Sequence, residues 1–431
     1  TAEEALNAVG DASGNGETNL KDVIASGSCL TDNLDTDGDG YVDNIIGWDT
    51  DADGGIADDD RDPMVNNNSH GTHVAGLVGA TTDNGIGVAS AAYNVSIMPV
   101  KSTGDETTNS INTGWDGILY AAQAGADIIN CSWGGPGYSS YAQNIINNVY
   151  NNYNALVVAA AGNGDDDGNA SDEPHYPSGY DHVVSVTAVS STDHFSWANY
   201  GAASGNFHGV DMSAPGESML STYITKESSY AYLTGTSMAS PFVASCFALL
   251  KSAYPDSSND WLVEHMLANT DPIDDINPDY AGQLGTGRVN ILKALAADKW
   301  PSLSIKDKTI SIWAGDGDSV LNPGETAILN VEVKNDTGWA DASNLLGVLT
   351  TEEAGINISD SLAAWSVIYQ NASSFNDGNG FSVSFADDLL PGTYNFKLKL
   401  EPATDEGFAY HFDLDLSIEI SLDQEGFPFY A

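Results

Sequence analysis

The sequence predicts an α/β domain with a parallel sheet flanked by helices on both faces, followed by an all-β antiparallel sandwich domain. The chain has 431 residues, which is more than one core usually organises, so two domains are expected. From His70 to residue 299, apolar strands alternate with helices, and this order is typical of a parallel sheet. After Lys299-Trp300-Pro301 only short alternating runs follow, so we place the domains at 1–299 and 302–431.

The elements of the first domain follow from its apolar patterns. Residues 1–68 are polar and rich in Gly, Asp and Asn, and we expect there only a helix at 2–9 and a short strand at 41–48. Beyond them, apolar residues at helical spacing predict helices at 72–81, 110–122, 139–153, 236–254 and 260–268. Apolar runs between these helices predict buried strands at 95–100, 126–132, 155–161 and 182–188.

The second domain is expected to contain strands only. Its apolar residues alternate with polar ones, which is typical of strands with one face buried, and turn residues separate the runs. The runs lie at 302–305, 309–312, 327–333, 345–350, 381–385, 392–400 and 409–420. Together they predict a sandwich of about 130 residues.

The charge of the chain excludes two classes of partner. Thirteen Lys and Arg face 61 Asp and Glu, so the net charge is −48. A surface this acidic repels nucleic-acid backbones and anionic lipid headgroups. No window approaches the roughly eighteen consecutive apolar residues of a membrane span. We expect a monomer that uses metal ions or salt to offset its self-repulsion.

The three cysteines allow at most one internal disulfide. Cys131 follows an apolar run and Cys246 lies inside one, so both are expected in the core. Cys29 lies in a polar stretch and could be paired or free. No signal peptide is present, which is compatible with either a mature secreted chain or a cytosolic one.

Two acidic loops have the spacing of calcium sites. Alternate side chains at positions 1, 3, 5 and 9 converge on one Ca²⁺, a backbone carbonyl serves at position 7, and Gly at position 6 permits the turn. The first loop supplies Asp35, Asp37, Asp39, Tyr41 and Asp43, with Gly40 at the turn. The second supplies Asp49, Asp51, Asp53 and Asp60, with Gly54 at the turn. No exit helix is evident, so these are expected to be isolated Ca²⁺ loops and not EF-hands.

Three segments carry side chains suited to acyl transfer. Ser237 opens an apolar helix, where backbone N–H groups and the positive end of the helix dipole favour an oxyanion. His70 opens another helix and can act as a general base. Asn163 follows a buried strand and can donate a hydrogen bond to the same oxyanion. Alone, each residue would be explained as a helix cap, a solvated side chain or a turn residue.

Taken together, these segments resemble the subtilisin-like serine protease (subtilase) family. The matching motifs are Ser69-His70-Gly71-Thr72-His73-Val74-Ala75-Gly76, Ala159-Ala160-Ala161-Gly162-Asn163 and Gly235-Thr236-Ser237-Met238-Ala239-Ser240-Pro241. The resemblance implies that Ser237 is the nucleophile, His70 the general base and Asn163 an oxyanion-hole residue. It also implies substrate contacts at Ser132, Trp133, Gly134, Ala161 and Gly162.

The second domain also carries a family resemblance. The segment from Asp316-Gly317-Asp318 to Asn322-Pro323-Gly324-Glu325 is similar to the start of Ig-like modules on secreted bacterial proteins. This resemblance implies an Ig-like sandwich. The sequence leaves open whether this segment binds a calcium ion.

The subtilase resemblance also implies an Asp that orients the imidazole of His70. The family carries this residue at the end of an apolar strand before the His, and no matching segment occurs here. Asp11 is the tentative candidate, 59 residues before His70. An acid on a segment absent from this chain, Asp49, and true loss of the acid are the alternatives.

We therefore expect a secreted, extracellular, calcium-dependent serine endopeptidase that acts on proteins or peptides. One alternative is a catalytically incomplete scaffold or binding protein. Another is a processed protease fragment that lacks its triad Asp. In a third, the sandwich carries the main function as an adhesion or polysaccharide-binding module.

Overall fold

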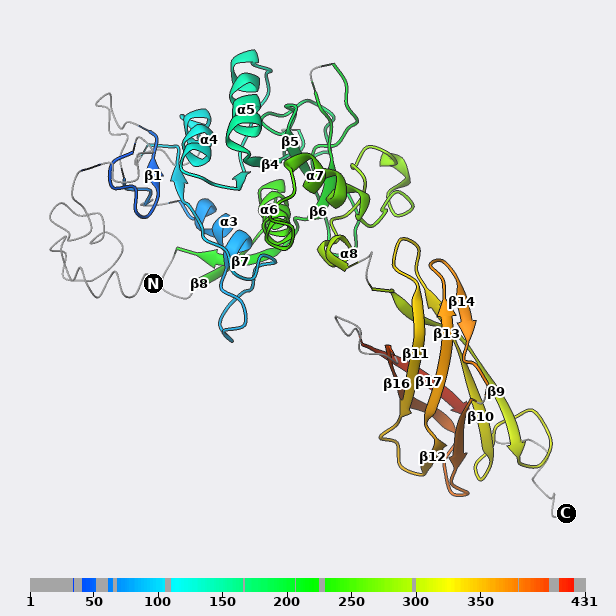
Figure 1. Ribbon diagram of the computed structural model, residues 1–431. Coiled ribbons are helices and arrows are strands. Elements are labelled where there is room, and N and C mark those ends of the chain that lie inside the picture. The colour runs from blue at the N-terminus through cyan, green and yellow to red at the C-terminus, as the bar shows by residue number, and fades with distance from the viewer. Residues whose placement is uncertain are drawn as a thin grey trace. The chain divides into compact units, whose positions relative to one another are not determined.

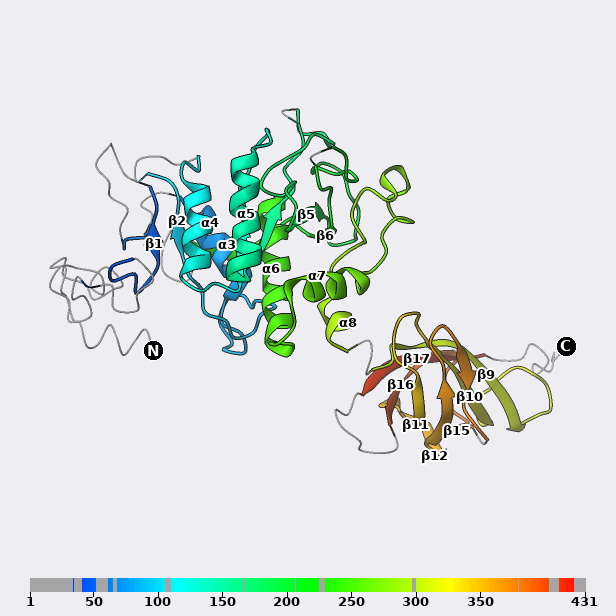
Figure 2. The ribbon, with the colours of Figure 1, turned by 45° about the horizontal axis from the view of Figure 1, so that its top comes forward.

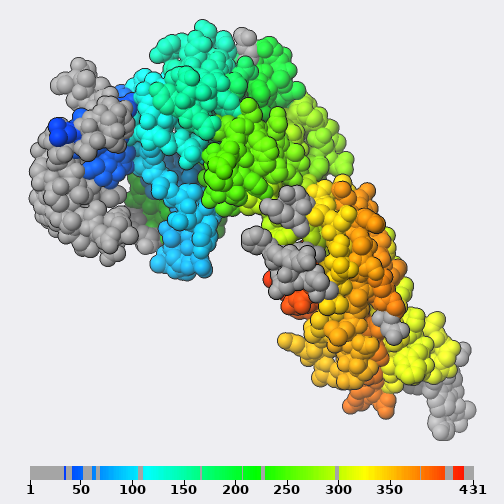
Figure 3. Space-filling model, viewed as in Figure 1, coloured from blue at the N-terminus to red at the C-terminus, as the bar shows by residue number. Residues whose placement is uncertain are grey.

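The computed structural model describes residues 34, 41–51, 61–64, 68–104, 110–165, 167–205, 207–224, 229–296, 300–378, 380–402 and 411–421 (Figure 1). The chain divides into two compact units, Thr1–Ala294 and Leu295–Ala431. The division falls slightly before the end of the first domain predicted from sequence. The C-terminal unit carries the yellow, orange and red part of the colour range in Figure 3.

A parallel sheet lies at the centre of the first unit. Its strands are β3 (Ile128–Cys131), β4 (Leu156–Ala160), β5 (Val183–Val189) and β6 (Met212–Pro215), in that spatial order. Every residue of β4 and β5 is buried, as expected of strands covered on both faces. The predicted strands at 126–132, 155–161 and 182–188 are thus confirmed with slightly different ends.

Among its described residues, this unit has the helices α3 (His70–Gly79), α4 (Gly114–Gln123), α5 (Ser140–Tyr153), α6 (Thr236–Ala253), α7 (Asn259–Ala268) and α8 (Ile291–Ala296), with a 3₁₀ turn at Pro278–Tyr280. Val157 and Ala159 of β4 share a buried cluster with side chains of α4 and α5. Side chains alternate across a strand, so Leu156 and Val158 point to the opposite face. Helix α6 packs against all four strands and against α3 (Figure 2).

Two of the predicted strands are much shorter than expected. Only β1 (Trp48–Asp49) and β2 (Val100–Lys101) form, as a separate parallel pair. The segment before β1 instead forms turns that are anchored on α4. The Tyr41 hydroxyl donates to Gln123 Oε1 over 2.8 Å, and Asn44 Nδ2 donates to the Tyr120 hydroxyl.

A hairpin that the sequence did not predict joins the sheet to α6. It consists of β7 (Met219–Tyr223) and β8 (Ser229–Leu233), which pair in antiparallel register from Met219↔Leu233 to Tyr223↔Ser229. Strand β7 packs against α3. The hairpin therefore lies between the helix that His70 opens and the residues that lead into Ser237.

The C-terminal unit consists mainly of antiparallel strands in two sheets. One sheet holds β12 (Ile356–Asp360), β15 (Phe381–Phe385), β10 (Thr326–Asn335), β14 (Ser373–Phe375) and β9 (Leu303–Ala314). The other holds β13 (Leu362–Ile368), β11 (Ala342–Thr350), β16 (Gly392–Pro402) and β17 (Phe412–Ile420). Strands β12 to β14 were not predicted, and the runs at 302–305 and 309–312 form the single strand β9.

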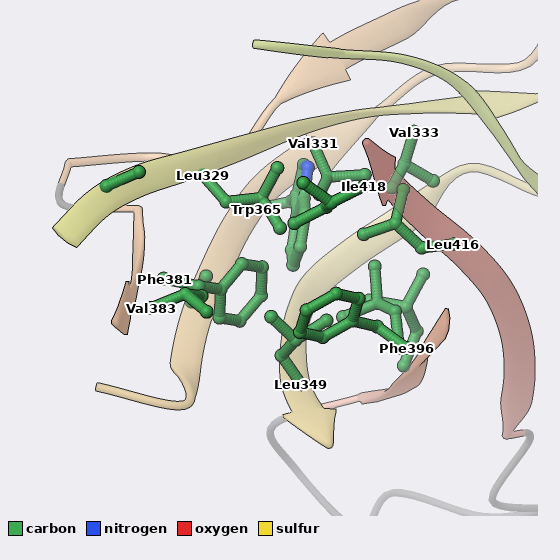
Figure 4. Close-up of a cluster of buried hydrophobic side chains, with 14 of the residues drawn as sticks. Leu329, Val331, Val333, Leu349, Trp365, Phe381, Val383, Phe396, Leu416 and Ile418 are labelled. Carbon is green, nitrogen blue, oxygen red and sulfur yellow. The ribbon is translucent and has the colours of Figure 1, made fainter. Parts of the chain in front are cut away.

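One hydrophobic core joins these two sheets. Leu329 and Val331 of β10 and Phe381 of β15 pack in the same buried cluster as Trp365 of β13 and Phe396 of β16 (Figure 4). Trp365 is 1% exposed, and its indole N–H donates to the carbonyl of Ser374 over 3.2 Å. The core therefore satisfies its largest polar-tipped side chain internally.

The acidic loop of the C-terminal unit is organised by one buried carboxylate. Glu325 is 5% exposed and accepts the backbone N–H groups of Asp316 and Asn322 over 3.1 and 2.8 Å. Asp316 and Asp318 accept backbone N–H groups of the same loop. Within the described residues no group of three acidic, His or Cys side chains could hold a metal ion.

Candidate active site

Ser237 lies at the start of α6 and is bound to the end of β3. Its hydroxyl donates to the carbonyl of Ser132 over 3.2 Å, and the Ser132 hydroxyl donates to the carbonyl of Ser237 over 2.8 Å. Ser237 is half-buried, so solvent reaches it. In the first turn of the helix, the N–H of Thr236 donates to Asn163 Oδ1 and that of Met238 donates to the carbonyl of Gly235. The positive end of the helix dipole at this turn favours negative charge near Ser237.

Asn163 is held by the residue that precedes Ser237. Its Oδ1 accepts both the backbone N–H and the hydroxyl of Thr236, each over 2.9 Å. A backbone N–H can only donate, so the amide oxygen must be the atom that faces Thr236. The Asn163 side chain is exposed, which leaves its Nδ2 free to donate to a ligand. Asn163 and Ser237 are thereby placed by the same turn of the chain.

The predicted substrate residues surround this turn. Gly162 has a φ of 113°, and a Cβ there would lie 2.6 Å from Asn199 Oδ1. Gly162 donates its N–H to the Thr236 hydroxyl over 3.3 Å, directly after the buried residue Ala161. The segment with Asn163 is therefore fixed from both sides, and only glycine fits at position 162.

Trp133 and Gly134 continue the chain after Ser132. The Trp133 ring meets the Trp115 ring edge-on, with centroids 5.3 Å apart. Gly134 lies against His175, because a Cβ there would be 2.3 Å from Cε1 of that ring. His175 Nδ1 is buried without a hydrogen-bond partner within the described residues, and burial lowers the pKa of the ring. His175 was not singled out from sequence.

His70 is the first residue of α3, and its backbone N–H donates to Asn68 Oδ1 over 2.8 Å. Burial lowers the pKa of its imidazole. A neutral ring is the form that a general base requires. Within the described part of the chain, the ring makes no hydrogen bond to a carboxylate, and the Ser237 hydroxyl is directed at Ser132.

The described acidic candidates have partners inside the protein. Asp43 pairs with Arg61 over 2.6 Å. Asp49 pairs with Lys101 over 2.5 Å, both buried, and its other oxygen accepts the backbone N–H of Asp51. Asp49 therefore faces an ammonium group rather than an imidazole. Asp51 accepts a hydrogen bond from Asn112 Nδ2 over 2.7 Å. The other acidic candidates lie outside the described residues: Asp11, Asp35, Asp37, Asp39, Asp53 and Asp60.

Sequence reasoning missed the residues that support the site. Thr236 and Asn199 hold the Asn163 segment, and Lys101 neutralises Asp49. Thr236 stands beside Ser237 in the chain, so a polar side chain there was a usable signal. Lys101 gave a signal too, because it directly follows an apolar run, and a cation that becomes buried there needs an acid as partner.

The residues of the candidate site also lie within a match to a known protein family. The model of the subtilase family matches residues 29–290, which include His70, Asn163 and Ser237. The chain belongs to the subtilase family. The matched range ends before the C-terminal unit begins, so that unit lies outside the family match.

Several proteases are similar to this subtilase. A thermophilic serine proteinase from Bacillus sp. (strain AK1) is 40% identical over 198 residues, which are 46% of each chain. Thermitase from Thermoactinomyces vulgaris is 37% identical over 253 residues, 58% of this chain and 81% of thermitase. The major intracellular serine protease of Bacillus subtilis (strain 168) is 37% identical over 246 residues, 56% of this chain and 70% of that protein. The chain thus spans less than half of the first of these relatives and more of the other two.

Proposed function

We propose that this subtilase is a serine endopeptidase in which Ser237 is the nucleophile. One observation supports this assignment above the others: Thr236 binds Asn163 Oδ1 through two hydrogen bonds, immediately before Ser237. A hydrogen-bond donor and a nucleophile are thereby held at one place. That pairing suits the tetrahedral intermediate of acyl transfer.

The reaction begins with a rotation of the Ser237 side chain away from the Ser132 carbonyl. The hydroxyl oxygen then attacks the scissile carbonyl carbon while its proton passes to the neutral imidazole of His70. Nδ2 of Asn163 and the backbone N–H of Ser237 donate to the oxyanion. The protonated imidazole gives its proton to the leaving amine, and water then cleaves the acyl-enzyme with His70 again acting as base.

The imidazole needs an acceptor for its second ring N–H, because that bond fixes the tautomer that can accept the Ser237 proton. We propose Asp11 as this acceptor within the chain. Asp49 is a weaker choice, since Lys101 and the Asp51 N–H already engage both of its oxygens. The other candidate acceptor is an acid on a segment absent from this chain.

Labelling with a fluorophosphonate tests the proposal directly. The reagent forms a covalent bond only with an activated serine hydroxyl, so we expect one label on the peptide that contains Ser237. Mass spectrometry of the digested protein locates the label, and Ser237→Ala is the control. An intact fold with no label on Ser237 would support a non-catalytic scaffold instead.

We further propose that Ca²⁺ binds the loop of Asp35, Asp37, Asp39, Tyr41 and Asp43. The donor chemistry suits this ion, since carboxylates and a backbone carbonyl are its preferred ligands. The Tyr41 ring lies 5.0 Å from Trp48 and 4.5 Å from Tyr120, so the end of the loop is anchored on α4. When bound, the ion would offset the repulsion between the carboxylates. Each loop has one described carboxylate in an ion pair, Asp43 with Arg61 and Asp49 with Lys101. Asp49 stands at position 1 of its loop, whereas Asp43 stands at position 9, which often binds Ca²⁺ through water, so the second loop is the weaker candidate.

The Ca²⁺ proposal implies a location for the protein, and the peptidase proposal implies its substrate class. Loops with the affinity of extracellular modules fill only at millimolar Ca²⁺, so we propose a secreted protein. The substrate would be a protein or peptide, and we propose that the enzyme acts as a monomer. Within the described residues no helix is both long and apolar enough to span a membrane.

A further inference from the structure

His73 is a buried histidine that the proposed reaction does not use. It lies one turn after His70 in α3 and is 0% exposed. Its Nε2 lies 3.1 Å from the carbonyl oxygen of Met219 and 3.0 Å from that of Ala231. Met219 belongs to β7 and Ala231 to β8. One ring nitrogen therefore contacts both strands of the hairpin.

These contacts determine the form of the ring. A carbonyl oxygen only accepts hydrogen bonds, so Nε2 must carry the proton and share it between the two carbonyls. Nδ1 is buried and has no partner within the described residues. A second proton on the ring would find no acceptor there. His73 is thus a donor through Nε2, with its other ring nitrogen left unsatisfied in the interior, and such groups call for an explanation.

Two more hydrogen bonds lie along the same contact. The Ser221 hydroxyl donates to the carbonyl of His73, and the Thr222 hydroxyl donates to the carbonyl of Thr72, each over 2.7 Å. Gly76 lets the two elements approach closely, because a Cβ there would lie 2.3 Å from Ser221 Oγ. The first turns of α3 are therefore bound to β7 at several points.

The hairpin also determines the position of the segment that carries Ser237. Strand β8 ends at Leu233, and Ser237 follows after Thr234, Gly235 and Thr236. Gly235 donates its N–H to the carbonyl of Gly216 over 2.9 Å, and Ser218 donates its N–H to the Thr234 hydroxyl. A displacement of the hairpin would therefore displace the start of α6.

We propose that His73 is a positioning residue that keeps the helix of His70 in register with the segment of Ser237. It does so by joining α3 to both strands of the hairpin through a single shared N–H. This inference rests on the proposed peptidase function. The shared bond explains why a polar ring with an unsatisfied nitrogen occupies a fully buried position between two elements.

Two substitutions test the role of His73. His73→Leu removes the donor that the two carbonyls share, whereas the amide of His73→Gln can donate to the same carbonyls. We expect His73→Leu to lower kcat by about 10- to 100-fold with KM nearly unchanged, the loss that a misplaced catalytic group produces. It should slow fluorophosphonate labelling of Ser237 by a similar factor. His73→Gln should recover most of both.

The matched control is His265→Leu. His265 in α7 also has its Nε2 at a backbone carbonyl, 2.6 Å from that of Ala294, but it contacts neither the hairpin nor α3 in the described structure. We expect it to lower the melting temperature and leave kcat and the labelling rate unchanged. Equal kcat losses in His265→Leu and His73→Leu would show general destabilisation and overturn the proposal.

Hydrogen exchange provides a readout that does not depend on activity. Backbone amides of β7 and β8 should exchange faster in His73→Leu than in the wild type. In His73→Gln they should exchange at nearly the wild-type rate. If His73→Leu does not fold, exchange in His73→Gln is compared with the wild type instead. Unchanged exchange, or a wild-type kcat in His73→Leu, would overturn the positioning role. If wild-type Ser237 is never labelled, the proposed peptidase function fails, and exchange alone then decides whether His73 holds the hairpin.

Discussion

The two units bury their strands in different ways. All seven residues of β5 in the first unit are buried, whereas the residues of β10 in the C-terminal unit alternate between buried and partly exposed. The first pattern arises because helices cover both faces of a parallel sheet. The second arises because each antiparallel sheet turns one face to the core and the other to solvent.

The units also differ in how they treat buried polar groups. Within the described residues, every buried side-chain N or O atom without a hydrogen-bond partner belongs to the first unit, and those of His73, Asn130 and His175 lie beside the site. In the C-terminal unit, the buried side chains of Glu325 and Asn335 are fully engaged. The comparison teaches that, among the described residues, the unsatisfied polar atoms lie in the unit that carries the candidate site.

The largest expected effect is on chemistry in the first unit. Ser237→Ala should lower peptidase activity by at least about three orders of magnitude, because the attacking hydroxyl is lost. The melting temperature should hardly change, since the hydroxyl makes only one hydrogen bond. Kinetics with a peptide substrate check this. Activity within about tenfold of the wild type would remove Ser237 from the mechanism.

The next effect is on stability in the C-terminal unit. Trp365→Ala should lower the free energy of unfolding of that unit by about 3–5 kcal/mol, because it leaves a cavity between the two sheets (Figure 4). Denaturant unfolding measures the loss, and kcat of the remaining folded protein should equal that of the wild type. A fall in kcat would show that loss of packing in this core also affects the candidate site.

Asn163→Ala should have a smaller effect, and again on chemistry. We expect kcat to fall by about 10²–10³ with little change in KM, because the Nδ2 hydrogen bond strengthens only as the oxyanion forms. Thr236 would keep its place in α6. Steady-state kinetics separate the two parameters, and a change confined to KM would place Asn163 in substrate binding instead.

Removal of Ca²⁺ should affect stability within the first unit. Without the ion, Asp35, Asp37 and Asp39 repel one another, so chelation should lower the free energy of unfolding by about 1 kcal/mol or more. A loss of about 1 kcal/mol corresponds to a fall in melting temperature of about 2–4 °C. Residues 30–62 should also become more susceptible to proteolysis. Identical melting curves with and without chelator would exclude a structural ion in the acidic loop.

The smallest effect concerns His208. A hydrogen bond to Asp211 over 3.0 Å raises the pKa of His208 in the folded protein, and nearby Asp181 adds to it. A raised pKa stabilises the fold at pH values below the ordinary pKa of histidine, and this contribution is lost as pH rises through the folded value. The side chain is 38% exposed, so His208→Asn should cost less than about 1 kcal/mol at pH 5.5 and nearly nothing at pH 9. Melting curves at both pH values check the sign.

The same comparison explains what the sequence could predict. Periodicity predicted α3, α5, α6 and β4, because local apolar patterns determine those elements. It failed at β7 and β8, whose burial is mixed and depends on contact with α3. It also failed for strand 41–48, because the segment is anchored on α4 through Tyr41 and Asn44 instead of continuing in a sheet.

The candidate site shows the same limit. His70, Asn163 and Ser237 were predicted because each carries reactive chemistry in a recognisable motif. Their supporting contacts were not, since partners such as Asn163 and Thr236 are 73 residues apart in the chain. The pairing of Asp49 with Lys101 was missed for the same reason, and the spacing of the acids alone suggested a metal ligand.

The two described cysteines have a practical consequence for measuring the opening of the first unit. Burial raises the pKa of both Cys131 and Cys246 to about 12, so at pH 8 only about one thiol in 10⁴ is ionised in the native fold. Cys131 lies in β3 directly before Ser132, and Cys246 lies in α6, the helix of Ser237. In a Cys29→Ser variant, the rate at which a reagent alkylates these two thiols would therefore measure how often the interior of the unit becomes exposed. This rate could be followed in the presence of an intact C-terminal unit, which contributes no cysteine to the signal.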